Sequence, residues 1–160
     1  MLKMLNNKYI KIKNNNNNKI KIRFANISDL HFIFRLYNQS VSEGSTFSKN
    51  KVNLSEHKIW FVNKINEKML FISLFKDKIG YVRYDYINKK NLSISIAIKK
   101  KYKRKGFGKQ MLVKTLKKKK ISKFNIIAII KKQNPESKKF FLDSGFKFFK
   151  KNIYMIKAKR

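Results

Sequence analysis

Residues 92–120 constrain the fold of this chain more than any other stretch, because a basic loop with two glycines joins two apolar patterns of different period. In residues 92–98 large apolar side chains alternate with small ones, which predicts a strand. After Gly106 and Gly108, apolar residues recur at helical spacing. Glycines let a backbone turn and approach a ligand closely, and the N–H groups that begin a helix attract anions. The stretch therefore predicts a phosphate-binding loop between a strand and a helix.

The rest of the chain predicts a sheet around this loop. The helix expected between strands 92–98 and 124–130 makes those two strands parallel, whereas the other connections suit antiparallel neighbours. The fold class is therefore α+β, with one central mixed, mostly antiparallel sheet of six to seven strands and about four helices. The expected strands cover residues 19–25, 69–75, 79–87, 92–98, 124–130, 146–149 and 153–156. The expected helices cover residues 29–39, about 55–65, 107–117 and 134–144.

Polar residues mark where these helices begin. Ser28 or Asp29 is expected to cap the first helix, and Ser55 the second, with Leu54 and Ile59 packed around that cap. Asn134 caps the last helix, with a proline in its first turn. Residues 1–18 are a polar, low-complexity lead-in that need not fold, and residues 19–160 form a single domain.

Composition bears mainly on the partners. The net charge of +33 invites a nucleic-acid interpretation, but only 5 of the 41 basic residues are Arg. Arg is the residue that makes bidentate phosphate contacts and reads bases, so the Lys excess indicates a compositional bias of the surface. A basic nucleic-acid-binding module stays as the non-enzyme alternative.

Several site classes are not expected. The chain has no Cys, which excludes disulfides and Cys-ligated zinc, and we expect no metal. No apolar run approaches the ~20 residues that cross a bilayer. We therefore expect a cytoplasmic protein that does not enter membranes, and we leave open whether it is a monomer or a homodimer.

Two motifs carry a resemblance to a known family. Residues 103–108 read KRKGFG and resemble the [Q/R]-x-x-G-x-[G/A] loop of the GCN5-related N-acetyltransferases (GNAT), apart from Lys103. The family's downstream pattern N-x-x-[A/S]-x-x-[L/F]-[Y/F]-x-x-x-G-F is similar to the set Asn134, Ser137, Phe140, Phe141, Gly145 and Phe146. The element order matches over about residues 19–157. The resemblance implies the GNAT fold, with a V-shaped cofactor cleft between the parallel fourth and fifth strands.

The resemblance also implies a cofactor, acetyl-coenzyme A (acetyl-CoA). Its pyrophosphate would be held by backbone N–H groups of the loop, with charge added by the first three residues. The implied loop residues are Lys103, Arg104, Lys105, Gly106, Phe107, Gly108 and Lys109. The pantetheine arm would lie against the backbone of Ile96, Ala97 and Ile98, with Asn134, Ser137 and Phe140 lining the same cleft.

A narrower similarity concerns the acceptor amine. Ser48 and residues 54–57, 60–61, 81–85 and 93–96 are similar to members that acetylate nucleotide-linked amino sugars, in the synthesis of nonulosonic acids such as pseudaminic acid and of other bacterial surface glycans. This similarity implies a nucleotide sugar as partner, with substrate contacts from Phe47, Ser48, Arg83 and Asp85. The alternatives are a protein N-terminus of the ribosomal-protein type and a polyamine.

Acetyl transfer needs a neutral amine and therefore a base. His57 is the first candidate, directly or through water, because its unperturbed pKa near ~6.5 suits the task. Glu56 and Asp85 flank the expected acceptor cleft. Phe141 stands where many members have a proton-donating Tyr. The candidates for the acid are therefore Tyr84, Tyr86 or a water, and the remaining alternative is that the thiol leaves unaided. Two alternatives stay open: His57 packs as a structural histidine, and Arg83 and Asp85, two residues apart on one strand face, form a structural ion pair.

Overall fold

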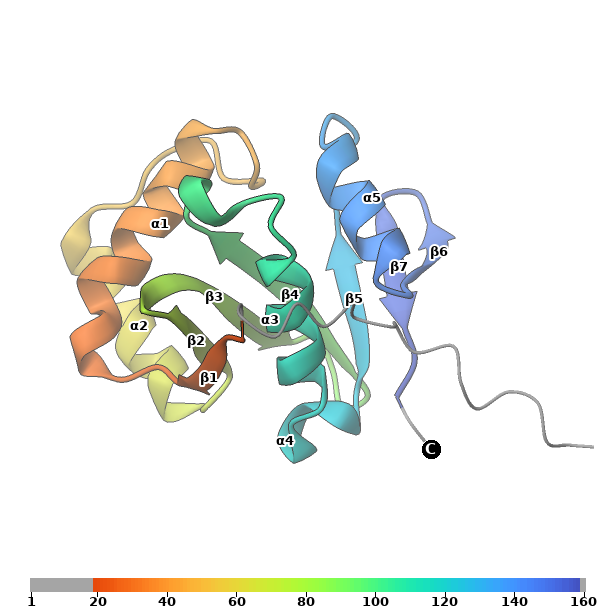
Figure 1. Cartoon of the computed structure of the whole chain (residues 1–160), viewed down its shortest axis with the longest axis horizontal. Coiled ribbons are helices and arrows are strands. Elements are labelled where there is room, and N and C mark those ends of the chain that lie inside the picture. The colour runs from red at the N-terminus through yellow and green to blue at the C-terminus, as the bar shows by residue number, and fades with distance from the viewer. Residues whose placement is uncertain (1–18, 159–160) are drawn as a thin grey trace, which may run out of the picture.

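The computed structural model describes residues 19–158. In it the protein consists of a seven-stranded sheet with helices packed on both faces (Figure 1). The predicted lead-in, residues 1–18, lies outside the described residues. The strands are β1 (Lys21–Phe24), β2 (Leu70–Phe75), β3 (Asp77–Tyr86), β4 (Asn91–Ile98), β5 (Asn125–Ile129), β6 (Lys147–Lys150) and β7 (Ile153–Ile156). The helices are α1 (Leu30–Ser42), α2 (Leu54–Asn66), α3 (Phe107–Leu116), α4 (Lys119–Ser122) and α5 (Pro135–Asp143), with 3₁₀ turns at Ile27–Asp29 and Lys100–Tyr102. The predicted fold class is confirmed.

The sheet contains one parallel pair. Its strand order is β1-β2-β3-β4-β5-β7-β6, and every neighbouring pair except β4 and β5 is antiparallel. The parallel register covers three positions, from Asn91 opposite Asn125 to Ser93 opposite Ile127. Beyond Ser93 the two strands diverge, and Figure 1 shows them separating toward the end that carries the loop before α3. The predicted V-shaped opening thus begins one third of the way along β4.

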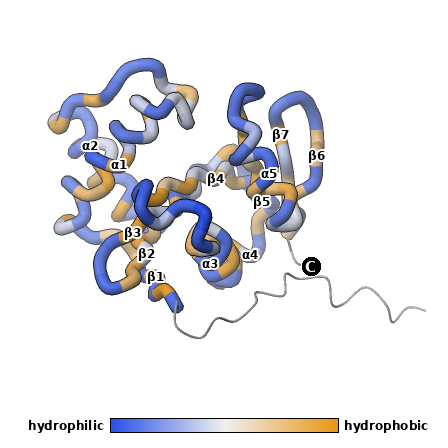
Figure 2. Tube along the Cα trace, turned by 45° about the horizontal axis from the view of Figure 1, so that its top comes forward, coloured by the Kyte–Doolittle hydropathy of each residue, from blue (hydrophilic) through white to orange (hydrophobic). Residues whose placement is uncertain are grey.

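Two apolar cores lie on opposite faces of the sheet. Alternation along the strands sends Leu92 and Ile94 into a core with α3, α4 and α5, whereas Ala97 joins a core with α1 and α2. Figure 2 shows apolar residues concentrated on the strands and on the sides of the helices that face them. Each helix therefore gains stability by covering sheet, as amphipathic helices do.

Three details at the helices differ from prediction. Asp29 is the N-cap residue of α1 as predicted, but its side chain makes no capping hydrogen bond there, and Asn26 caps the 3₁₀ turn before it. Asn53, not Ser55, caps α2 by accepting a hydrogen bond from the N–H of Glu56 at 2.9 Å. Ile59 is 70% exposed, so the expected packing around Ser55 does not form. The short α4 was not predicted, because four residues are too few for a periodic pattern. Asn134 caps α5 as predicted, accepting from the N–H of Ser137 at 3.0 Å.

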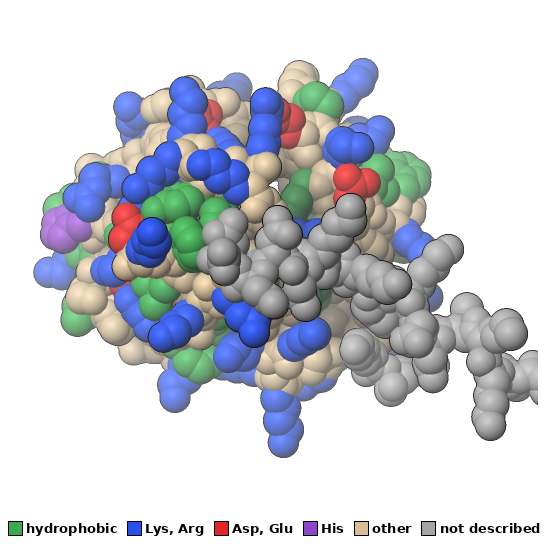
Figure 3. All heavy atoms as spheres, in the orientation of Figure 1, with side chains coloured by type: hydrophobic (Ala, Val, Ile, Leu, Met, Phe, Trp, Pro, Cys, Tyr) green, Lys and Arg blue, Asp and Glu red, His purple; other side chains and the backbone are tan. Residues whose placement is uncertain are grey.

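The basic residues are distributed over the surface. Figure 3 shows Lys and Arg side chains over most of the visible face, with no single stripe, and few acidic side chains among them. No helix among the described residues is long and apolar enough to span a membrane.

Asp29 links the 3₁₀ turn before α1 to the sheet. Its carboxylate is fully buried and accepts two hydrogen bonds from Arg23, at 2.6 and 2.8 Å, and one from the N–H of Asn26 at 2.9 Å. Lys78 lies 2.7 Å from the same carboxylate. Burial raises the pKa of Asp29, but the hydrogen bonds from Arg23, Lys78 and Asn26 outweigh it and lower this pKa to about 2.

We predict that Asp29→Asn destabilises the protein at neutral pH. The pKa of Asp29 falls from 3.8 to about 2 on folding, which corresponds to roughly 2.5 kcal/mol at ~1.36 kcal/mol per pKa unit. Because the folded pKa is the lower one, this stabilisation is present above about pH 4 and is lost as the pH falls toward 2. Urea unfolding at pH 7 and pH 3 measures the difference.

The matched control is Asp143→Asn. The Asp143 side chain is 60% exposed and pairs with Lys139 at 3.7 Å. Exposed pairs contribute little, so this variant should change the unfolding free energy by less than ~1 kcal/mol. Equal effects of the two variants would contradict the role given to Asp29.

Candidate functional site

The loop before α3 presents backbone donors that have no hydrogen-bond partner among residues 19–158. Gly106 precedes the helix with φ +79° and has no side chain to cap it. The first N–H groups of a helix lack intrahelical partners, so those of α3 are available to donate hydrogen bonds to a ligand at the loop. A Cβ on Gly108 would lie 3.3 Å from Cε2 of Phe140, which shows how closely α5 approaches this loop. The loop therefore brings the first N–H groups of α3 close to α5, and anion binding there stays a prediction.

Strand β4 directs backbone groups into the opening beside it. The N–H of Lys99 donates to the carbonyl of Ile79 at 2.8 Å, and the N–H of Ile87 donates to the carbonyl of Asn91 at 3.0 Å. Bonded and non-bonded pairs alternate along an antiparallel ladder, so the odd-numbered residues of β4 bond β3. Ile96 and Ile98 therefore direct their N–H and C=O groups toward the side where β5 has diverged.

A cavity of about 550 Å³ extends from the loop along this part of β4 to α5. Most residues expected to bind the cofactor line it. They are Ile96, Ala97, Ile98, Lys103, Arg104, Gly106, Gly108, Lys109, Asn134, Ser137 and Phe140. Lys105 is exposed and Phe107 is buried in the core under the loop, so these two could contribute backbone groups but do not line the cavity with their side chains.

Two ion pairs hold basic side chains of the loop. Lys103 lies 2.7 Å from Glu43, at the end of α1, and Arg104 pairs with Glu136 of α5. Hydrogen bonds from Lys103 and Gln39 lower the pKa of Glu43. The loop is therefore tied to both α1 and α5 across the large cavity.

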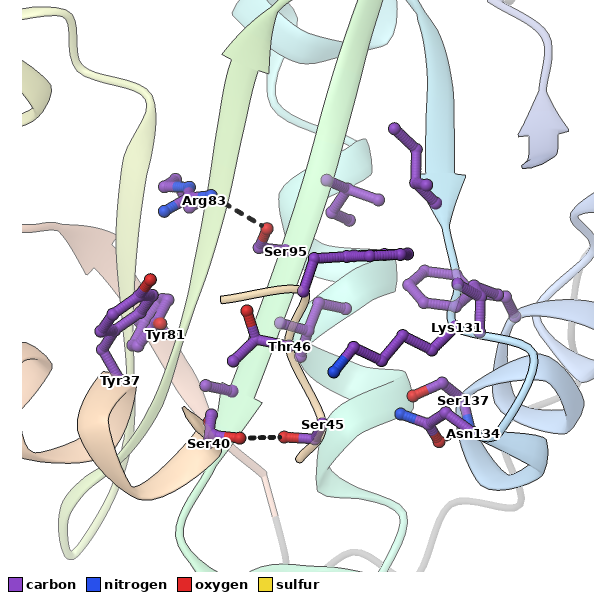
Figure 4. A pocket seen from close by; sticks show the side chains of 17 residues that line it. Tyr37, Ser40, Ser45, Thr46, Tyr81, Arg83, Ser95, Lys131, Asn134 and Ser137 are labelled. Carbon is purple, nitrogen blue, oxygen red and sulfur yellow. Dashed lines mark hydrogen bonds between the residues drawn. The ribbon is translucent and has the colours of Figure 1, made fainter. Parts of the chain in front are cut away.

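A second cavity, of about 170 Å³, is lined by residues of β3, β4 and the end of β5, with residues of the loop after α1 (Figure 4). The two cavities share lining residues, so they meet. The shared residues are Ser40, Ser45, Ile96, Ala97, Asn134, Ser137 and Phe141. A group bound in one cavity would thus lie next to a group bound in the other.

The titratable residues that line the small cavity are Tyr37, Tyr81, Arg83 and Lys131. None of its lining residues, all of which lie in the described part of the chain, is Asp, Glu or His. Burial raises the pKa of Tyr81 to about 12, so its hydroxyl stays protonated. The cavity therefore offers hydroxyls and two cations and no side-chain carboxylate.

The structure separates the predicted catalytic residues. His57 is 4% exposed and packs among Phe34, Tyr37, Trp60 and Phe61, without lining either cavity. Its Nε2 has no hydrogen-bond partner within the described residues. Burial lowers the pKa of His57, and the charge of Arg83 lowers it further. Its surroundings match the alternative of a packing histidine.

Glu56 and Tyr84 are also outside the cavities. Glu56 is exposed in the first turn of α2. Tyr84 is buried on the opposite face of the sheet, where its hydroxyl shares a 2.8 Å hydrogen bond with Thr115 and burial raises its pKa. A phenol in that core cannot reach the small cavity, so its position does not support the predicted acid.

The predicted substrate residues divide into two groups. Arg83 and Phe47 line the small cavity, whereas Asp85 and Ser48 do not. Asp85 lies 2.8 Å from Arg83 Nε, in an ion pair without aligned hydrogen-bond geometry, and 2.8 Å from Lys64. These contacts agree with the structural ion pair left open above. Ser48 shares a 2.6 Å hydrogen bond with the hydroxyl of Tyr37.

Sequence reasoning missed several lining residues. Ser45 and Thr46 belong to the polar loop after α1, which carried a signal in its length and its small polar residues. Tyr37 has helical spacing typical of a core position. Lys131 follows the parallel strand β5, and ligands often bind at the carboxyl ends of such strands.

Comparisons with known proteins identify the family of this arrangement. A family model of the acetyltransferase (GNAT) domain matches residues 19–147. No curated protein matches the chain. Among solved structures, an N-acetyltransferase from Staphylococcus aureus Mu50 is 19% identical with a TM-score of 0.75, over 88% of this chain and 99% of that one. A likeness at this identity shows a shared fold.

Two further structures have named activities. A phosphinothricin acetyltransferase from Sinorhizobium meliloti, in complex with acetyl-CoA, is 20% identical with a TM-score of 0.71 over 85% of each chain. A ribosomal-protein-alanine N-acetyltransferase from Brucella melitensis is 18% identical with a TM-score of 0.70, over 84% of this chain and 95% of that one. The same fold thus occurs in enzymes with different acceptors.

We predict that the imidazole of His57 titrates below pH 6.5 and is neutral at pH 7, because burial lowers its pKa. The unfolded chain then binds this proton more tightly than the folded one, so the unfolding free energy falls as the pH drops below about 6.5. Imidazole carbon shifts followed against pH measure the titration, with His31→Asn to assign the signals. His57→Phe should remove this part of the pH dependence. A titration of His57 at or above 6.5 would contradict the prediction.

Proposed function

Because the chain belongs to the GNAT family of acetyltransferases, we propose that it acetylates the primary amine of a small acceptor, most specifically a nucleotide-linked amino sugar. The chain is an N-acetyltransferase, and its donor is acetyl-CoA. The observation that carries the proposal is the pair of cavities that meet at Ile96 and Asn134. One has the lining expected for the donor, and the other has hydroxyls and cations suited to a sugar phosphate.

The residues of the large cavity fit acetyl-CoA. Its pyrophosphate matches the unpaired N–H groups after Gly106, together with the charges of Lys103 and Arg104. The amide groups of its pantetheine arm match the carbonyl of Ile96 and the backbone groups of Ile98 that face away from β3, so the arm would pair with β4 as another strand would. When bound, acetyl-CoA supplies an acetyl group activated as a thioester.

Two residues, Ile96 and Phe141, bear on the reaction at the place where the two cavities meet. The N–H of Ile96, which faces the opening, is a preorganised donor for the negative charge that develops on the acyl oxygen during attack by the amine. Phe141 lies at the same point and has no proton to give, so a departing thiolate would be protonated by water or leave unaided.

His57 stays a proposed base, through an intermediate group. Its ring centroid lies 6.2 Å from that of Tyr37, which lines the small cavity. A proton could pass from the amine to His57 by way of the Tyr37 hydroxyl or a water. A lowered pKa keeps the imidazole unprotonated and able to accept it.

The small cavity favours an acceptor with hydroxyl groups. Ser45, Thr46 and Ser95 offer hydroxyls, and the roughly 170 Å³ volume suits one sugar-sized group. The nucleoside of the proposed acceptor would then lie outside this cavity. Substrate contacts are proposed for Arg83 and Phe47, which line it, while Asp85 holds Arg83 in place.

We predict that Gly106→Val weakens acetyl-CoA binding at least ~10-fold. Its φ of +79° is strained for any residue with a Cβ, at a cost of order 1–3 kcal/mol, so the loop would shift and move its N–H groups. Isothermal titration calorimetry with acetyl-CoA measures the change. Gly145→Val is the matched control, because Gly145 has φ +88° at the end of α5 and does not line the large cavity. Unchanged binding by Gly106→Val would refute the loop as the pyrophosphate site.

The acceptor is tested by an acetylation screen. We expect the largest kcat/KM for a uridine-diphosphate-linked 4-amino sugar, compared with N-terminal ribosomal-protein peptides and with spermidine, as followed by release of free thiol from acetyl-CoA. A peptide or polyamine as the best acceptor would disprove the sugar assignment and leave the acetyltransferase assignment intact.

A further inference from the structure

We propose that Lys131 and Arg83 form an anion-binding subsite in the small cavity. The enzyme would then select acceptors that carry an anionic group in addition to the amine. The inference rests on the proposed function, because it takes the small cavity as the acceptor site. It assigns a specificity-determining role to Lys131, which no sequence motif indicated.

Lys131 extends into the cavity from the end of β5. Figure 4 shows its side chain crossing the cavity toward Thr46, and the residue is half-buried. Its ammonium donates to the carbonyl of Gly44 at 3.2 Å and lies 5.9 Å from the ring centroid of Phe47. Among the described residues, no carboxylate lies within ion-pair distance of it. An ammonium has three donors, so Lys131 keeps hydrogen-bonding capacity for a ligand.

Arg83 presents its guanidinium from the β3 side of the cavity. The group lies 5.3 Å from the ring centroid of Trp60, and one terminal nitrogen donates to Ser95 Oγ at 3.3 Å. Asp85 offsets its charge, but Asp85 also pairs with Lys64, which in turn pairs with Glu67. The four charges of that cluster sum to zero. Among the described residues that line the small cavity, Lys131 therefore carries the charge that no ion pair offsets.

The remaining titratable groups do not cancel this charge. Tyr37 and Tyr81 face the cavity, and burial raises the pKa of Tyr81, which keeps its hydroxyl neutral. Glu43, one residue before Gly44, is paired with Lys103. The cavity is therefore positive, which favours an anionic group on the acceptor and repels a polycation.

A positive cavity also bears on the reaction itself. A nearby cation disfavours the protonated form of an amine, and the neutral form is the one that attacks. The anionic group of the acceptor supplies the binding energy, and the cations bias the amine toward its reactive state. This arrangement suits a cavity lined by hydroxyls and cations with no carboxylate.

The test compares two probes that differ by one phosphate, glucosamine 6-phosphate and glucosamine, by calorimetry on the protein saturated with coenzyme A, which occupies the loop site first. We expect the phosphorylated probe to bind the wild type at least ~10-fold more tightly, as a charge-assisted contact would allow. Lys131→Glu should abolish this preference. Lys132→Glu is the matched control, because Lys132 is an exposed neighbour outside the cavity lining, and it should preserve the preference.

Each outcome has a defined meaning. The subsite is disproved if the phosphorylated probe does not bind, if both probes bind equally to the wild type, or if the two variants behave alike. Coenzyme A affinity, measured first in every variant, reports folding and an intact loop. A wild type that fails to bind coenzyme A would refute the proposed function instead, so the two failures can be told apart.

Discussion

The early divergence of β4 from β5 is the constraint on which the site depends. Three paired positions hold the strands together, and beyond Ser93 the backbone groups of β4 that point away from β3 have no paired strand among the described residues. Backbone donors and acceptors in a sheet need partners, so the opening favours a ligand that can act as a strand. The loop before α3 lies at the end of the same opening, and α5 lines its other side. Divergence therefore creates the cleft, and the helices on either side determine what binds in it.

Much of this arrangement follows from local pattern. The loop, α3 and the buried β5 were predictable because glycines, helical spacing and an unbroken apolar run all act over short distances. The position of Tyr84 also follows from local pattern, since alternation along β3 sends the Arg83 and Asp85 side chains to one face of the sheet and that of Tyr84 to the other. The contacts of Lys131 and Thr46 could not be predicted, because they depend on how the loop after α1 packs against the end of β5. The exchange of Asn53 for Ser55 as cap reflects the usual uncertainty of a helix end by a residue or two.

The scarcity of acids shapes the chemistry left to the enzyme. The chain has eight Asp and Glu residues. Seven of them form ion pairs within residues 19–158, and Glu56 forms none with a residue of that range. Those pairs hold β1 to β3 at Asp29, α2 to β3 at Asp85, and the loop before α3 to α1 at Glu43. Carboxylates are thus used for tying elements together, and the small cavity receives none. A lysine-rich composition becomes compatible with acetyl transfer when the acceptor itself carries the negative charge.

The helix cap at the start of α5 fixes the orientation of the Asn134 side-chain amide, and so determines which of its polar atoms a ligand meets. Its side-chain oxygen accepts from the N–H of Ser137, so the amide cannot rotate without losing that bond. The nitrogen is therefore the end left for a ligand, and Figure 4 shows it directed toward the small cavity. A ligand oxygen could accept a hydrogen bond from this nitrogen, whereas a ligand N–H group would find no acceptor at this position. The helix cap thus favours the orientation in which a bound amide or ester places its carbonyl oxygen next to Asn134.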